Sequence, residues 1–220
     1  MKKNGFTLAE VIISCGILSL FMVGVISLYT SGGKAGNTTM WLQTATNQLK
    51  LAARQINTSI QKSSYPSKIV YPSDIIKSEQ NNFKVRYKAN TTVSGTETNF
   101  LIVTEAIPAK TGGLEGDVNA QLFYHVFSLG TNGDLIYYRY KDSAAPSLIT
   151  TSFTRTVPNG TNIEYKTKLV KDVESIVCKK VDNDRNDSPL EVTITCHMPR
   201  SKTIRSEKAI GVPNVQIAEL

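Results

Sequence analysis

The chain opens with an apolar segment, from Phe6 to Tyr29, that contains a single charged side chain, Glu10. An α-helix of this length spans about 36 Å, which is enough to cross a hydrocarbon core of about 30 Å. Lys2 and Lys3 precede the segment, and positive residues before a span favour a cytoplasmic N-terminus. The sequence therefore predicts a single-pass membrane protein whose remaining residues lie on the extracytoplasmic side.

The acidic residue in this span indicates a function, because a carboxylate in hydrocarbon is costly unless it is paired or protonated. Glu10 follows the Gly5–Phe6 junction by four residues, within Lys-x-Gly-Phe-Thr-Leu-x-Glu. This N-terminus resembles the signal of type IV prepilins and type II secretion pseudopilins. The resemblance implies that residues 1–5 are a leader peptide, that a prepilin peptidase cleaves after Gly5, and that Phe6 becomes N-methylated. It also implies that Glu10 pairs with the Phe6 amine of a neighbouring subunit during assembly.

Two other interpretations of the N-terminus stay open at the level of sequence. An ordinary secretory signal peptide would be cut near residues 31–33, although Glu10 and the length of the apolar segment oppose this. A plain bitopic anchor carrying an extracytoplasmic ligand-binding β-domain is the alternative from another functional class. The mature N-terminal residue separates the three cases: Phe6 for a pilin-like protein, Met1 for an anchor, and a residue near Lys34 for a secreted protein.

Charge and composition limit the partners that we expect. The formal net charge is +7, and removal of Lys2 and Lys3 with the leader lowers it to +5. Lysines and arginines are not clustered among aromatic residues, so we do not expect a nucleic-acid partner. The resemblance instead implies other pilin or pseudopilin subunits, the prepilin peptidase, the inner-membrane assembly platform and membrane lipid. It places the chain first in the inner membrane and then in a filament on the cell surface or in the periplasm.

The helical part of the chain is predicted in two halves. Residues 6–30 are expected to form a transmembrane helix that later lies in a filament core. Residues 31–65 are expected to form an amphipathic helix, because apolar residues recur at three- and four-residue spacing from Leu42 to Ile60. The glycines of 31–36 predict a bend or partial melting between the halves. Asn37 or Thr38 is expected to cap the second half, and Pro66 to end it.

The remainder, residues 66–220, reads as one β-rich extracytoplasmic domain. The Gly130–Gly133 segment contains Asn-Gly and predicts a hairpin that pairs 123–127 with 135–139. The expected fold class is α+β, a pilin-like fold in which a long N-terminal helix packs on a mostly antiparallel sheet. Further strands are expected at 83–88, 100–103, 148–155, 163–180, 190–198 and 208–217, with loops at 90–98 and 108–119.

Patterns typical of an active site are missing from the sequence. There is no nucleophile elbow, no phosphate-binding glycine loop and no zinc-like spacing, so we expect neither an enzyme nor a cofactor. His125 and His197 fall in predicted strands and are interpreted as structural or surface residues. Asp182, Asp184 and Asp187 form a weak calcium candidate, but the intervening arginine competes with a cation, and a solvated hairpin tip explains them better.

Two cysteines of the exported domain are predicted to form a disulfide. Strands at 173–181 and 190–198 would form a hairpin centred near Asp187, and this register places Cys178 opposite Cys196 on the inward face. Opposed residues lie within the distance that a disulfide spans, and an oxidising compartment permits the bond. The alternative is a pair of buried free thiols.

Overall fold

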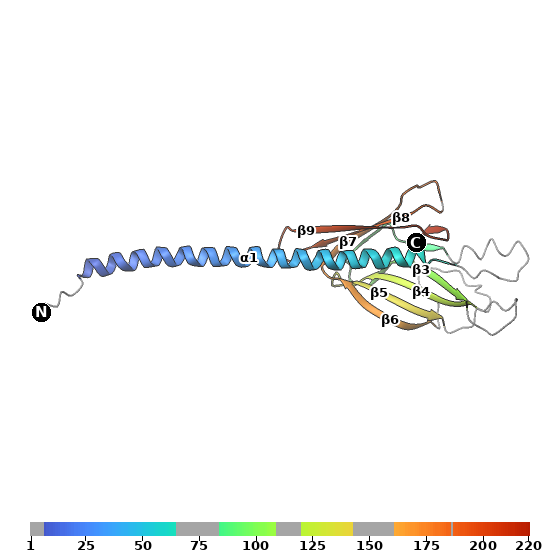
Figure 1. The fold of residues 1–220 in the computed structure, drawn as a ribbon, viewed down its shortest axis with the longest axis horizontal. Coiled ribbons are helices and arrows are strands. Elements are labelled where there is room, and N and C mark those ends of the chain that lie inside the picture. The colour runs from blue at the N-terminus through green and yellow to red at the C-terminus, as the bar shows by residue number, and fades with distance from the viewer. Residues whose placement is uncertain (1–6, 65–83, 109–119, 143–160, 186) are drawn as a thin grey trace, which may run out of the picture. The chain divides into compact units, whose positions relative to one another are not determined.

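The structure is a computed structural model that describes residues 7–64, 84–108, 120–142, 161–185 and 187–220 (Figure 1). The chain divides into two units, Met1–Gln43 and Thr44–Leu220. One helix, α1 (Leu8–Gln61), belongs to both units, and all described strands belong to the second. The α+β, pilin-like architecture expected from the sequence is confirmed.

Helix α1 runs without interruption through the glycine-rich segment 31–36, where we expected a bend or partial melting. Asn37 and Thr38 accordingly lie inside the helix and do not cap a second one. Each glycine weakens a helix by about 1 kcal/mol, but elongation of an existing helix adds one hydrogen bond per residue and avoids a second nucleation. Long helical segments on both sides therefore outweigh the local preference.

The part of α1 within unit 2 is amphipathic, as predicted. Its buried face repeats at three- and four-residue intervals and comprises Ala45, Leu49, Ala52, Ala53, Ile56, Ser59 and Ile60. This stripe lies against strands, which provide the apolar cover that an amphipathic helix of this kind requires.

Two sheets, rather than the single sheet that we expected, make up the β-structure of unit 2. The six-stranded sheet has the order β10-β1-β3-β4-β5-β6 and the four-stranded sheet has the order β2-β7-β8-β9. Neighbouring strands are antiparallel except β1 and β10, which are parallel. The strands are β1 (Val85–Tyr87), β2 (Asn90–Thr92), β3 (Thr98–Pro108), β4 (Ala120–Leu129), β5 (Leu135–Asp142), β6 (Thr161–Val170), β7 (Val173–Lys180), β8 (Leu190–His197), β9 (Ile204–Gly211) and β10 (Ile217–Glu219).

The extra sheet arises where two predicted strands are each divided. The expected strand 163–180 breaks into β6 and β7 at Asp172, whose φ of 58° lies in the left-handed region and ends the extended conformation. The expected strand 208–217 breaks into β9 and β10, which join different sheets. The segment 90–98, expected to be a loop, contains β2. The predicted strand 148–155 and nearly all of the predicted loop 108–119 lie outside the described residues.

The predicted hairpin is confirmed as β4–β5, although its strand partners lie two residues beyond an end-to-end alignment of 123–127 with 135–139, since Phe123 pairs with Lys141. Phe127 pairs with Tyr137 and His125 with Arg139 across the Gly130–Gly133 turn. Gly133 has a φ of 74°, a conformation that glycine adopts without steric penalty. This pairing decides which side chains of the sheet face α1, and it places the polar residues described below on that face.

Both sheets contact α1 within unit 2. On one side, Leu51 and Gln55 of α1 line a groove with residues of β5 and β6. On the other side, Ile60 of α1 packs so closely on Gly211 of β9 that an added Cβ would lie 2.7 Å from the Ile60 Cβ. The six-stranded sheet also buries a second cluster on its other face, consisting of Ile102, Tyr124, Val126 and Tyr138.

Candidate assembly site and buried polar network

Glu10 and Thr7 form a reciprocal cap at the N-terminus of α1. The Glu10 Oε2 atom accepts hydrogen bonds from the backbone N–H of Thr7 at 2.8 Å and from its hydroxyl at 2.9 Å. The Glu10 backbone N–H in turn donates to Thr7 Oγ1 at 3.3 Å. This arrangement is a capping box, in which a threonine before the helix and a glutamate three residues later satisfy each other's backbone donors.

The capping box uses one oxygen of the carboxylate. Both hydrogen bonds that the Glu10 side chain accepts from described residues involve Oε2, and the side chain is exposed. The geometry therefore leaves Oε1 available to a further donor or cation. The predicted partner of Glu10, the amine of Phe6, lies outside the described residues, as does Gly5.

The part of α1 within unit 1 exposes its apolar side chains on every side. Large hydrophobic residues from Leu8 to Tyr29 are all exposed, from 42% for Val25 to 83% for Tyr29. The helix is long and apolar enough to cross a membrane, and none of the most apolar window is buried. A helix that is hydrophobic on all sides requires lipid or other helices around it.

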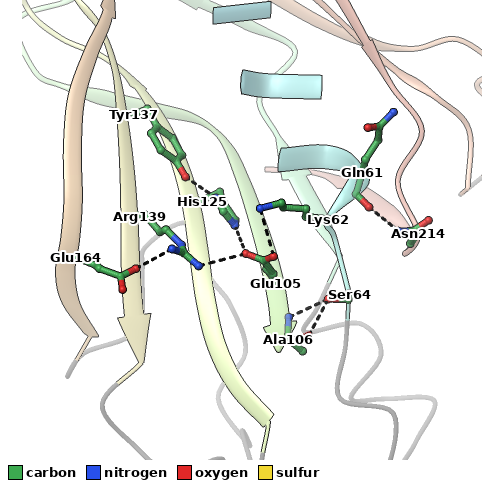
Figure 2. A network of polar contacts seen from close by, with 10 residues as sticks. All are labelled: Gln61, Lys62, Ser64, Glu105, Ala106, His125, Tyr137, Arg139, Glu164 and Asn214. Carbon is green, nitrogen blue, oxygen red and sulfur yellow. Dashed lines mark hydrogen bonds and ion pairs between the residues drawn. The ribbon is translucent and has the colours of Figure 1, made fainter. Parts of the chain in front are cut away.

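Sequence reasoning missed a polar network beneath the C-terminal end of α1 (Figure 2). Glu105 of β3 accepts a hydrogen bond from His125 of β4, with 2.9 Å between Oε2 and Nε2. The other ring nitrogen of His125, Nδ1, lies 2.7 Å from the Tyr137 hydroxyl on β5. One neutral tautomer satisfies all three groups: the Tyr137 hydroxyl donates to Nδ1, and Nε2–H donates to the carboxylate. All three residues are buried.

Two cations complete this network. Lys62, just beyond α1, and Arg139 of β5 each place a nitrogen 3.7 Å from a Glu105 oxygen. Arg139 also contacts Glu164 at 3.1 Å and lies over the Phe123 ring. The hydrogen bond from His125 lowers the pKa of Glu105, and the positive charges of Lys62 and Arg139 lower it further against the opposing effect of burial. Glu105 is therefore ionised near neutral pH.

The signal for this network is present in the sequence. Glu105 interrupts an apolar run from Phe100 to Ile107 that is otherwise typical of a buried strand. A carboxylate in such a run needs a buried partner. His125 occurs in a second apolar run, and the β4–β5 hairpin places it opposite Arg139. The missing information was the pairing of β3 with β4, which joins Glu105 to that hairpin.

The C-terminal end of α1 is tied to both sheets (Figure 2). Ser64 donates its N–H to the Thr104 carbonyl at 2.9 Å, and its hydroxyl accepts from the Ala106 N–H at 2.9 Å. On the other side, the Asn214 side-chain amide donates to the Gln61 carbonyl at 2.6 Å. The Asn214 bond satisfies a carbonyl that a helix end otherwise leaves without a partner, and the Ser64 bonds fix the residues after α1 to β3.

The predicted Cys178–Cys196 disulfide is not formed, and both cysteines are buried free thiols. Cys178 lies opposite Val192, whereas Cys196 lies opposite Val173. The thiols share a face but are about four residues apart along the ladder, roughly 13 Å, which exceeds the reach of a disulfide. The turn is centred two residues earlier than predicted, near Arg185, and a bulge shifts the register near Val173.

The candidate calcium loop is organised by internal contacts. Arg185 forms two hydrogen bonds with the Asp187 carboxylate, at 3.1 and 3.0 Å. Asp182 accepts from the backbone N–H of Asp184 at 3.0 Å. Within the described residues, no group of three or more His, Cys, Asp or Glu side chains is arranged to hold a metal ion. His197, the second histidine considered above, is partly exposed at the end of β8.

Comparison with known proteins gives one match, and it coincides with the capped and exposed part of α1. Residues 1–26 match the model of the prokaryotic N-terminal methylation motif. No curated protein and no solved structure matches the chain. The chain thus carries the N-terminal methylation motif typical of the type IV prepilin and pseudopilin family.

Proposed function

We propose that the chain is a minor pilin or pseudopilin, a structural subunit of a type IV pilus or type II secretion-like filament. The observation that carries this proposal is the methylation motif over residues 1–26, on a helix whose large apolar side chains are exposed from Leu8 to Tyr29. The prepilin peptidase cleaves between Gly5 and Phe6, and Phe6 is then methylated. Until assembly, the helix is anchored in the inner membrane with the β-domain outside.

Assembly in this proposal is a packing reaction and not a catalytic one. The helix leaves lipid and packs among the helices of neighbouring subunits, which replace the acyl chains around it. The contacts of Glu10 support a specific role for its two oxygens. Oε2 is held by Thr7 of the same chain, and Oε1 receives the Phe6 amine of a neighbour, so that two buried charges neutralise each other.

Processing is tested by the intact mass of the chain extracted from the membranes of a filament-producing host. We expect a mature chain that begins at Phe6 and carries one N-terminal methyl group. A chain that keeps Met1 in such a host would refute the proposal and favour the bitopic anchor. A chain that begins near Lys34 would indicate a secreted protein.

The role of the Glu10 charge is tested by two substitutions. Glu10→Ala removes both the charge and the cap, whereas Glu10→Gln retains an oxygen that accepts the Thr7 hydrogen bonds. We expect both variants to insert in the membrane, because loss of a charge makes the span more apolar. Both should be depleted from sheared filaments relative to the membrane fraction. Normal recovery of Glu10→Gln in filaments would show that the charge has no part in assembly.

A further inference from the structure

We propose that unit 2 binds the anionic headgroup surface of the membrane in which the chain is anchored, through the β8–β9 turn. The binding groups are Arg200, Lys202 and Arg205. The inference rests on the membrane-anchoring part of the proposed function, and it adds a second contact between the subunit and its membrane before assembly.

The first step is the position of this turn within unit 2, which residues 31–43, here called the tether, join to the span. Residues 207–210 of β9 line a groove with Lys50 and Arg54 of α1, and Gly211 contacts Ile60. The strand and the helix therefore run side by side in the same direction. The turn before β9 consequently lies beside the first residues of α1 in unit 2, which follow the tether directly in the chain.

Contacts in the neighbouring strands support the same placement. The Lys171 N–H, between β6 and β7, donates to the Gln48 side chain of α1 at 3.3 Å. The His197 N–H, at the end of β8, donates to the Asp172 carbonyl at 2.9 Å. The end of the four-stranded sheet that carries the β8–β9 turn is thus bound to the part of α1 nearest the tether.

The second step is the charge of this surface. Residues 198–206 contain three cations, Arg200, Lys202 and Arg205, and no carboxylate. All three side chains are exposed, and within the part of the chain that the structure describes none has an ion-pair or hydrogen-bond partner. Acidic residues of the adjacent strands, such as Glu174 and Glu207, reduce the net charge of the region but do not pair with these groups.

The helix that leads to this surface is also devoid of acidic residues. From Val11 to the end of α1 at Gln61 there is no Asp or Glu, whereas Lys34, Lys50 and Arg54 are present. All charged side chains of α1 after Glu10 are therefore cationic. An anionic lipid surface complements this charge, and each lysine or arginine near such a surface strengthens binding about fivefold.

The length of the tether limits the electrostatic attraction between the turn and the bilayer. Residues 31–43 extend about 20 Å as a helix, which is more than the Debye length of about 8 Å at physiological salt. Salt therefore screens attraction over that length, and binding requires direct contact between the turn and the headgroups. This requirement makes the distance between the turn and the bilayer the quantity to measure.

The experiment uses the full chain with Cys15→Ser and with Pro199→Cys carrying a fluorescent donor. Cys178 and Cys196 are buried, so labelling of the folded chain is confined to the introduced thiol. The chain is inserted in vesicles of phosphatidylcholine alone or with one third phosphatidylglycerol, each with an acceptor on a lipid headgroup. We expect stronger energy transfer with phosphatidylglycerol, and loss of the difference at high salt.

A triple variant, R200Q/K202Q/R205Q, tests the named residues. The ratio of bound to free turn should fall by about fivefold per cation, on the order of 100-fold for all three. The matched control, K88Q/K141Q/K180Q, removes the same charge elsewhere on unit 2 and should retain the phosphatidylglycerol effect.

Equal energy transfer in the two kinds of vesicle would overturn the proposal, and so would an equal loss in both triple variants. Crosslinking of the turn to an acidic protein without any dependence on lipid would also overturn it, in favour of a protein partner. The measurement does not require cleavage at Gly5. A processed, assembling chain without lipid dependence would therefore refute this inference alone, whereas lipid dependence in a chain that keeps Met1 would refute the filament function alone.

Discussion

Replacement of Glu105 should destabilise unit 2 by an amount that depends on what the new side chain leaves unpaired. The carboxylate is 8% exposed and lies within hydrogen-bond distance of His125, with Lys62 and Arg139 both at 3.7 Å. Glu105→Leu has a similar volume but provides no acceptor. Glu105→Gln provides an acceptor for His125 but no charge.

The expected magnitudes follow from these contacts. Removal of one partner from a buried ion pair typically destabilises a protein by about 3–5 kcal/mol, because the other charge is left uncompensated. Lys62 is half-exposed and Arg139 retains Glu164, so for Glu105→Leu we expect the lower end, about 3 kcal/mol. For Glu105→Gln we expect about 1–2 kcal/mol, the difference between a charged and a neutral hydrogen bond.

The measurement is the urea midpoint for protease resistance of the β-domain, with the full chain held in mild detergent. Acidification provides a second observation. The pKa of Glu105 is lowered in the folded state, so its contribution to stability is complete above the ordinary pKa of 4.5 and is lost as the pH falls through the folded value. The difference between wild type and Glu105→Gln should therefore shrink below pH 4.5.

Two outcomes would refute this reasoning. If Glu105→Leu were as stable as wild type, the buried groups around the carboxylate would not need it. If the difference between wild type and Glu105→Gln stayed constant through the acid range, the ionised form of Glu105 would not be the source of stability.

Two further predictions concern the strand connections and the thiols. Gly133→Ala should lower the free energy of unfolding by at least about 1 kcal/mol, because the φ of Gly133 is positive and the added Cβ would lie 2.8 Å from the Val173 carbonyl oxygen. Gly130→Ala is the control: its added Cβ would lie no closer than 3.4 Å to another atom, so the urea midpoint should change less. Cys178 and Cys196, whose pKa values burial raises to about 12, should resist thiol reagents in the folded chain and react fully after unfolding without reductant. If Cys178 and Cys196 stayed unreactive in the unfolded, unreduced chain, they would form the disulfide that the observed register excludes.

Local sequence patterns predicted the parts of the fold that depend on neighbours in the chain. The Asn-Gly turn predicted that β4 and β5 form a hairpin, because such a turn joins neighbouring antiparallel strands, but it left the register open by two residues. The three- and four-residue spacing after Leu42 predicted the buried face of α1. The N-terminal motif was read from contiguous residues, and the family comparison matches it.

Features that depend on distant residues or on competing local effects were predicted less well. The Cys178–Cys196 pairing failed because a turn centred two residues away from the assumed position changes every cross-strand partner. The Glu105 network requires the pairing of β3 with β4, which no turn signal in the described sequence specifies. The glycines of 31–36 indicated a break, but the cooperativity of a long helix prevails over such local preferences.

The ties at the end of α1 have a mechanical consequence. In the proposed filament, tension along α1 would reach unit 2 through the buried face of the helix and through the ties at its end. Ser64 passes tension to β3, and Asn214 passes it to the segment between β9 and β10. The tension is thus shared between β3 of the six-stranded sheet and the segment that joins β9 of the four-stranded sheet to β10 of the six-stranded sheet, so that both sheets bear force together.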